Sequence, residues 1–146
     1  MDGSTTTGKI AVGTYWEPAT WDLARSAYIA DLDTDPTSPG SFVGWLQQAL
    51  RCHLDRTTAA RIAFQVAPPQ RKQTGGPPKL NKTFPLAAGL VKDLGVAVVD
   101  DRVNGRVISR SGLIHEAVTV AALRAQERLG TDLPAPPPRL PNRPPR

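Results

Sequence analysis

The sequence has one cysteine, few aromatic residues and no long apolar run. A single thiol excludes a disulfide framework and a four-thiolate zinc site within the chain. A membrane-spanning helix needs ~20 consecutive apolar residues, and no segment approaches that length. The first nine residues, MDGSTTTGK, lack the charged and apolar regions of a secretory signal peptide. We therefore expect a soluble, cytoplasmic protein that does not associate with a membrane.

Basic charge is concentrated in the second half of the 146 residues. Residues 1–65 hold five basic and seven acidic residues, a net charge of −2. Residues 66–146 hold thirteen basic and six acidic residues, a net charge of +7. An anionic partner is expected to meet the second half first. The alternative is that the uneven surface charge serves only solubility.

Eleven of the fifteen prolines lie in two segments, and neither a helix nor an inner strand tolerates this density of proline. The first lies within residues 59–78, which we predict to be a linker. The second, residues 131–146, combines proline with arginine and is predicted to be a disordered basic tail. Residues 1–8 are predicted to be a flexible N-terminus.

Two segments between these boundaries share one pattern. Residues 9–58 begin with an alternating strand, in which Val12 and Trp16 point the same way. Pro18 suits the first turn of a helix, and Ser41 is a plausible N-cap for a second one. Residues 79–130 repeat this order: a strand at 79–84, a helix that begins at Pro85, and a second helix capped by Ser109 or Ser111.

The two segments overlay without gaps at an offset of 68 residues, with Ser41 on Ser109 and Gly44 on Gly112. One strand followed by two helices cannot bury its own apolar face. We therefore predict a fold that is mainly α with short β, in which two strand-helix-helix units combine through antiparallel strands. The units pair either within one chain, as a pseudo-dimer, or between chains, as a homodimer.

This arrangement resembles the ribbon-helix-helix family of DNA-binding proteins, of the Arc and MetJ type. The strings that carry the resemblance are KLNKTFP (79–85) and SRSGLIHEAV (109–118). Within residues 9–58, the strings ARSAY (24–28) and SFVGWL (41–46) also look like ParB-type centromere-binding proteins of actinobacterial plasmids. Lys82 departs from the pattern, because it stands where the family has an inward apolar residue. Either its stem lies under the sheet or the register slips.

The resemblance implies sequence-specific binding of double-stranded DNA by a two-stranded ribbon in the major groove. Lys79, Asn81 and Thr83 would then face the base edges and read them. The backbone at the start of each second helix would bind phosphate, at Ser109, Arg110 and Ser111 and at Ser41. The alternative for Asn81 and Thr83 is that they are ordinary solvated strand residues.

The resemblance favours plasmid partition, with a ParA-like ATPase as partner. The alternatives are an antitoxin that represses its own operon and binds a toxin, and a relaxosome accessory protein like TraY. All three use the same ribbon, so the sequence does not separate them. No catalytic constellation, metal site or cofactor motif can be assembled from the sequence, and we predict that the protein is not an enzyme.

Several other residues are assigned structural roles. Cys52 is predicted to be a small core residue, and the adjacent His53 faces another direction, so the two cannot form a metal-binding pair. Two acidic groups, Asp31-Asp33-Asp35 and Asp100-Asp101, are predicted to be solvated surface at the ends of helices. The three tryptophans, Trp16, Trp21 and Trp45, are predicted to lie in the core.

Overall fold

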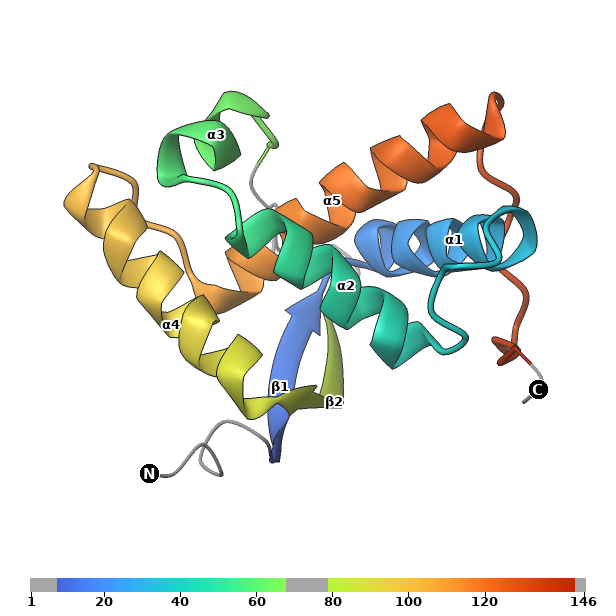
Figure 1. Ribbon diagram of the computed structural model, residues 1–146, viewed down its shortest axis with the longest axis horizontal. Coiled ribbons are helices and arrows are strands. Elements are labelled where there is room, and N and C mark those ends of the chain that lie inside the picture. The colour runs from blue at the N-terminus through green and yellow to red at the C-terminus, as the bar shows by residue number, and fades with distance from the viewer. Residues whose placement is uncertain (1–7, 68–78, 144–146) are drawn as a thin grey trace.

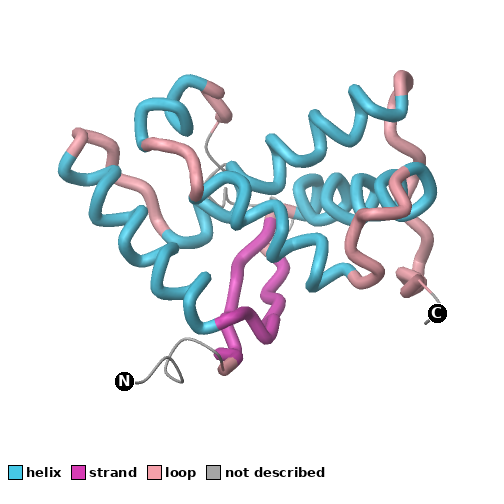
Figure 2. Tube along the Cα trace, viewed as in Figure 1, coloured by secondary structure: helices cyan, strands magenta, loops and turns pink. Residues whose placement is uncertain are grey.

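The computed structural model describes residues 8–67 and 79–143 as helices arranged around a two-stranded sheet (Figures 1 and 2). The prediction of a mainly helical fold with short strands is confirmed. The order strand, helix, helix occurs in both halves, and the first half adds a short helix. In chain order the elements are β1 (Lys9–Trp16), α1 (Pro18–Thr34), α2 (Phe42–Leu54), α3 (Thr58–Ala63), β2 (Leu80–Ala87), α4 (Ala88–Val103) and α5 (Arg110–Leu129).

The two strands pair antiparallel within the single chain. Val12 lies opposite Phe84, and Tyr15 lies opposite Asn81. Alternate residues point to opposite faces of a strand, so one face of the ribbon is buried and the other is exposed. The buried side chains from both strands are Val12, Thr14, Trp16, Phe84 and Leu86.

The helices of the two halves pack across one another. Helix α1 packs chiefly against α5, α4 packs against both α2 and α5, and α2 crosses α5 in the middle of the molecule (Figure 1). Neither half therefore encloses a hydrophobic core of its own. The two strand-helix-helix segments instead pack on each other and share one core. One strand and two helices were expected to be too few to bury their own apolar face.

The second helix of each half begins with the same cap. Ser41 Oγ accepts a hydrogen bond from the Gly44 amide at 3.1 Å, and Ser109 Oγ accepts one from the Gly112 amide at 3.0 Å. A Cβ atom on Gly44 would lie 3.0 Å from Pro39, and one on Gly112 would lie 2.9 Å from Ile108. Both glycines thus leave room for the chain that enters the helix. Ser41 is the predicted cap, and of the two serines proposed for α5 it is Ser109 that caps.

Strand β2 is longer than predicted. Pro85 does not begin a helix: it lies inside the strand opposite Ala11, and α4 begins only at Ala88. Both strands of a two-stranded sheet are edges, where proline is tolerated. The amide of Ala87 is satisfied by Gln47 Oε1 on α2 at 2.7 Å, which holds the end of the strand against the helix layer.

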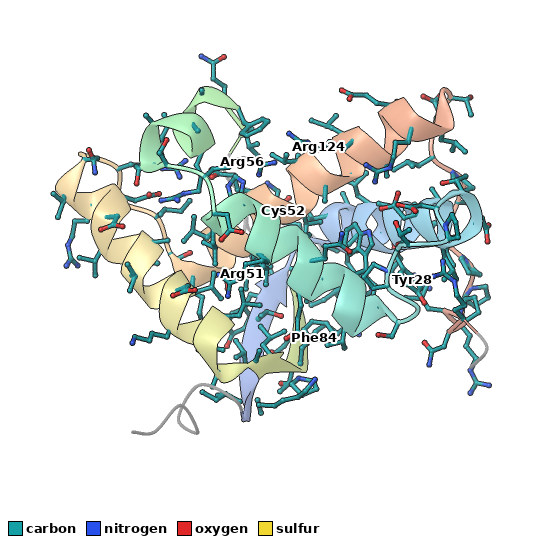
Figure 3. The ribbon with its side chains drawn as sticks, viewed as in Figure 1. Tyr28, Arg51, Cys52, Arg56, Phe84 and Arg124 are labelled. Carbon is teal, nitrogen blue, oxygen red and sulfur yellow. The ribbon has the colours of Figure 1, made fainter. Side chains whose placement is uncertain are left out.

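An aromatic cluster fills the space between the ribbon and the helices, where Phe84 is labelled in Figure 3. Trp16 and Trp45 are buried, as predicted, and Trp21 is partly buried. Lys82 keeps the predicted register and lies on the inner face. Its ammonium stands 4.9 Å from the centre of the Trp21 ring, a cation–π contact. A lysine is therefore accommodated beneath the sheet without a slip in register.

The predicted linker is partly helical. Residues 58–63 form α3, capped by Thr57 Oγ1, which accepts from the Ala60 amide at 3.1 Å. The helix is held in place by Arg61, whose side chain is almost fully buried. Residues 68–78, which contain all four prolines of this segment, lie outside the described residues.

The prediction of a disordered tail is wrong for residues 131–143. Leu133 and Leu140 pack against the hydrophobic core, and Tyr28 Oη donates to the Pro141 carbonyl at 2.6 Å. The amide of Arg143 donates to the Gly40 carbonyl at 2.8 Å. Proline removes backbone donors but keeps every carbonyl acceptor, so side-chain donors from α1 can hold a proline-rich segment in place.

Candidate nucleic-acid interface

The exposed face of the ribbon carries the predicted base-reading residues. Asn81 and Thr83 are both exposed on β2, opposite Tyr15 and Gly13 of β1. Lys79 lies one residue before the strand and is also exposed. Asn81 and Thr83 therefore alternate with inward-facing residues, as the sequence pattern predicted. Together with Lys79 they place three polar side chains in and just before the first half of β2.

The β1 side of this face is sparse in side chains. Tyr15 is 62% exposed, and its neighbour on the same face is Gly13. A Cβ atom on Gly13 would meet nothing within 4 Å, and its backbone conformation is not left-handed. Packing and backbone strain therefore do not explain a glycine in the middle of a strand. The missing side chain leaves the backbone exposed opposite Thr83.

The starts of α2 and α5 present backbone amides, as predicted for phosphate binding. The hydroxyl oxygens of Ser41 and Ser109 accept the capping hydrogen bonds, so these serines hold the helix ends in shape, and each hydroxyl keeps its own proton as a donor. Within the described residues, the amides of Arg110 and Ser111 have no acceptor. The first amides of an α-helix are unpaired and carry partial positive charge, which attracts anions.

Helix α5 begins beside the end of the ribbon. The amide of Tyr15 lies 3.5 Å from Ser111 Oγ. Together with Lys79 and Glu17, these residues line a hollow of about 240 Å³. The negative charge of the Glu17 carboxylate opposes an anion at this position. One oxygen of this carboxylate is buried with no hydrogen-bond partner among the described residues.

His115 also lines this hollow, but its ring is engaged on both sides. Nδ1 lies 3.2 Å from Thr20 Oγ1, and Nε2 lies 3.0 Å from the Ala67 carbonyl oxygen. We therefore assign it to holding α1 and the chain after α3 against α5. Arg110 is exposed on the first turn and forms no ion pair with the residues that the structure describes.

The start of α2 has a different neighbour, the C-terminal tail. A Cβ atom on Gly40 would lie 2.9 Å from Cβ of Arg143, so the tail runs directly past the residue before the Ser41 cap. The Arg143 guanidinium donates to four carbonyl oxygens at the end of α1 and in the following loop, those of Leu32, Asp35, Pro36 and Ser38, at 2.6–3.1 Å. The starts of α2 and α5 thus have the same serine cap but different neighbours: the tail lies beside α2, and the end of the ribbon lies beside α5.

A buried charged network, which the sequence analysis did not predict, lies away from the ribbon. Asp101 on α4 accepts from Arg61 Nη2 at 2.6 Å and from Arg106 Nη2 at 2.6 Å. Arg106 also donates to Glu116 on α5 at 2.6 Å, and Glu116 lies 2.7 Å from Nε2 of His53 on α2. Burial raises the pKa of Glu116, but the hydrogen bonds from His53 and Arg106 outweigh it and hold that pKa below its usual value.

Two of the acids predicted to be solvated surface are buried, whereas Asp33 and Asp100 are exposed as predicted. Asp101 has no exposed area, and Asp31 is also buried, where it accepts from Trp45 Nε1 at 2.9 Å and pairs with Arg128 at 2.6 Å. The acids are buried because their partners come from other helices. Sequence spacing gave no signal for these pairs, since each partner lies at least 14 residues away or in a loop.

Cys52 is exposed, so its predicted place in the core is wrong. The adjacent His53 is buried, which places the two side chains on different faces of α2 as expected. Within residues 8–67 and 79–143 no three His, Cys, Asp or Glu side chains are grouped closely enough to hold a metal ion. None of the helices described here has the length and apolar composition required to cross a bilayer.

Comparison with known proteins gives no further information about the ribbon, the helix starts or the charged network. No protein-family model matches the sequence, and no match was found among curated proteins or solved structures. The functional argument therefore depends on the geometry of the ribbon, the helix starts and the charged residues around them.

Proposed function

We propose that the protein binds double-stranded DNA in a sequence-specific manner, with the β1–β2 ribbon inserted in the major groove. The observation that carries the proposal is the outer face of the ribbon, where Asn81 and Thr83 are exposed side by side along β2. The B-DNA major groove is wide enough to admit a two-stranded ribbon. Its floor presents donors and acceptors that differ for each base pair.

The side chains on this face have the chemistry that base recognition needs. Asn81 can pair bidentately with adenine N6 and N7, and Lys79 can donate to guanine O6 or N7. Thr83 can bond to a base or contact a thymine methyl group, and Gly13 opposite to it lets the ribbon approach the bases. Because β1 carries only Lys9 and Tyr15 as polar side chains on this face, we assign most of the sequence discrimination to β2.

Phosphate contacts would come from the starts of the two second helices. The amides of Arg110 and Ser111 in α5, and those of Phe42 and Val43 in α2, have no acceptor within the described part of the chain. Such contacts fix the orientation of a protein on the duplex and carry no sequence information. The exposed guanidinium of Arg110 adds charge at one of these positions.

The resemblance of residues 24–28 and 41–46 to ParB-type centromere-binding proteins supports a role in plasmid partition, with a ParA-like ATPase as the partner. Stimulation of a ParA-like ATPase by this protein tests the assignment directly. Neutralisation of a neighbouring toxin, or stimulation of a relaxase, would replace the partition role and leave DNA binding intact.

The DNA-binding proposal is tested by selection from a duplex library with a randomised centre, followed by fluorescence anisotropy on a selected and an unselected duplex. We expect Asn81→Ala to weaken binding to the selected duplex by about tenfold, which corresponds to the loss of roughly 1–3 kcal/mol for one base contact. Binding to the unselected duplex should change little. The matched control is Asn142→Ala, which removes an exposed asparagine from the tail.

Salt dependence gives a second test of the same proposal. With roughly five phosphate contacts, the logarithm of the binding constant should fall with the logarithm of salt concentration at a slope of about −4 to −5. A library that yields no enriched sequence, together with binding that is insensitive to salt, would refute the proposal.

A further inference from the structure

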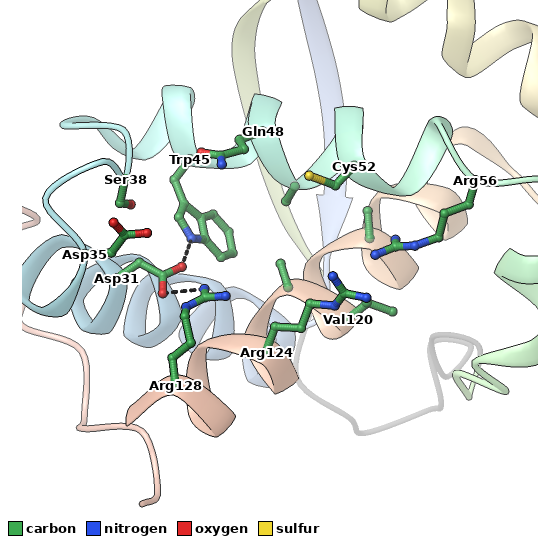
Figure 4. Close-up of a pocket in the computed structure, with 13 residues that line it drawn as sticks. Asp31, Asp35, Ser38, Trp45, Gln48, Cys52, Arg56, Val120, Arg124 and Arg128 are labelled. Atoms are coloured by element: carbon green, nitrogen blue, oxygen red, sulfur yellow. Dashed lines mark hydrogen bonds and ion pairs between the residues drawn. The ribbon is translucent and has the colours of Figure 1, made fainter. Parts of the chain in front are cut away.

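A cavity of about 140 Å³ lies between α2 and α5, with the end of α1 on one side (Figure 4). Its apolar lining consists of small side chains from the two helices, among them Ala49 and Val120. The indole ring of Trp45 stands at the α1 end. No residue of either strand lines the cavity, so it is separate from the proposed DNA-binding face.

Two guanidinium groups converge on the other end of the cavity. Arg56 follows α2 and Arg124 lies on α5, and Figure 4 shows both directed toward the space below Cys52. The contacts of Arg56 are His53 Nδ1 at 3.0 Å and the Phe64 ring at 4.8 Å, and neither is a carboxylate. Arg124 has no carboxylate within ion-pair distance among the described residues.

The positive charge at this end is therefore not neutralised by neighbouring acids. Burial lowers the pKa of the Arg56 guanidinium, and the nearby charge of Arg124 lowers it further. Like charges at close range disfavour each other unless an anion lies between them. At the α1 end the situation differs, because Arg128 is paired with Asp31 at 2.6 Å.

A second, independent observation concerns the α1 end of the cavity. Ser38 lines the α1 end and is 7% exposed, and its hydroxyl has no hydrogen-bond partner within the described residues. Buried hydroxyl groups in folded proteins are nearly always hydrogen-bonded, because an unpaired one costs free energy. Both ends of the cavity thus have polar groups that a bound molecule would satisfy.

We propose that this cavity binds a short organic carboxylate, held between Arg56 and Arg124, with its apolar body against Ala49 and Val120. The planar fork of a guanidinium matches a carboxylate and pairs with it bidentately. The apolar lining favours a ligand with a hydrocarbon part over a fully hydrated inorganic anion. The size is suitable, since an apolar cavity of about 150 Å³ accommodates benzene.

The test uses sodium benzoate, benzamide and inorganic phosphate as probes on the full chain. Calorimetry measures binding, and the ¹H–¹⁵N signal of the Trp45 indole reports contact, because that N–H donates to Asp31 beside the cavity. We expect saturable benzoate binding that shifts this signal, with benzamide and phosphate each at least about tenfold weaker. Equal binding of phosphate or benzamide, or a shift that never saturates, would overturn the proposal.

Three variants separate the cavity from general charge effects. Arg124→Gln should weaken benzoate binding by about tenfold or more, because it removes half of the guanidinium pair. Ala121→Leu keeps every charge but places a larger side chain at the cavity wall, and it should also abolish binding. Arg102→Gln removes an exposed arginine on α4 outside the cavity and should have no effect. Unchanged binding in both Arg124→Gln and Ala121→Leu, with folding verified by circular dichroism, would refute the site.

Discussion

Nη2 of Arg61 on α3 lies 2.6 Å from Oδ1 of Asp101 on α4, and both side chains are almost completely buried. The pair joins a helix from the predicted linker to the second half of the chain. Arg61 also donates to the Arg56 carbonyl at 2.9 Å and to Thr58 Oγ1 at 2.9 Å, whereas its Nε is buried with no hydrogen-bond partner among the described residues. A buried ion pair of this kind holds α3 in one position. This part of the predicted linker is therefore not a flexible connection.

Removal of Asp101 should be strongly destabilising. Asp101→Ala leaves the guanidiniums of Arg61 and Arg106 without a shared carboxylate, and an uncompensated buried charge costs about 3–5 kcal/mol. Urea unfolding followed by tryptophan fluorescence measures the change. The adjacent Asp100 is exposed, and Asp100→Ala should alter the free energy of unfolding by no more than about 0.5 kcal/mol. Equal effects of the two substitutions would show that the network does not stabilise the fold.

Stability should fall with acidification through the titration of Glu116. The folded-state pKa of this carboxyl is below its ordinary value of 4.5, so the stabilisation is fully present above pH 4.5. It is lost as the pH falls through the folded-state pKa, because the folded state must then take up the proton that the unfolded state already binds. Unfolding in urea at a series of pH values measures this loss. Glu116→Gln should be less stable at neutral pH and should have a shallower acid slope, and parallel profiles would contradict the prediction.

Gly13 should be important for DNA binding and unimportant for folding. Gly13→Val adds a side chain to open space on a strand, where valine is favoured, so stability should be unchanged or higher. On the proposed DNA face the same side chain should block close approach, and affinity for a selected duplex should fall by about tenfold or more. Gly95→Ala is the matched control, since this glycine also has open space around it but lies on α4. That variant should gain up to about 1 kcal/mol in stability and bind DNA normally.

Glu17 should weaken the binding of anions at the start of α5. Glu17→Gln removes a negative charge from the hollow that Ser111 and Lys79 line, so DNA affinity should rise several-fold at low salt. Anisotropy at two salt concentrations tests this, and the gain should shrink as salt screens the charge. Asp22→Asn removes an exposed charge from α1, the helix that follows Glu17, outside the hollow, and should have a smaller effect. A larger gain from Asp22→Asn would place the phosphate contact elsewhere.

The tail should contribute to stability through Arg143. Arg143→Ala removes the guanidinium contacts to carbonyl oxygens at the end of α1, and we expect a loss of about 1–3 kcal/mol. Limited proteolysis should then cut the tail more rapidly after Arg139. Asn142→Ala is the control, because Asn142 is exposed in the same tail and the substitution keeps the cleavage site at Arg139. A tail that is cut equally rapidly in the wild-type protein would show that it is not held in solution.

Local patterns were sufficient for the ribbon and for the helix caps. The alternation of Val12 and Trp16 with exposed residues placed the inner face of β1 correctly, because side chains in a strand change sides at every step. Ser41 and Ser109 were identified as caps because a serine hydroxyl satisfies a helix-start amide within the same few residues. Such features depend only on neighbours in the sequence.

Long-range packing decided the features that the sequence left open or predicted wrongly. Pro85 remained in a strand because β1 and Gln47 supply partners there, and the tail is fixed because Tyr28 and the carbonyls near Gly40 lie within its reach. Asp101 is buried only because Arg61 and Arg106 arrive from separate segments. The sequence by itself determined a basic second half and two strand-helix-helix patterns. Only the tertiary structure determined which strands pair, which charges are buried and where Arg56 meets Arg124, because these depend on contacts between residues far apart in the chain.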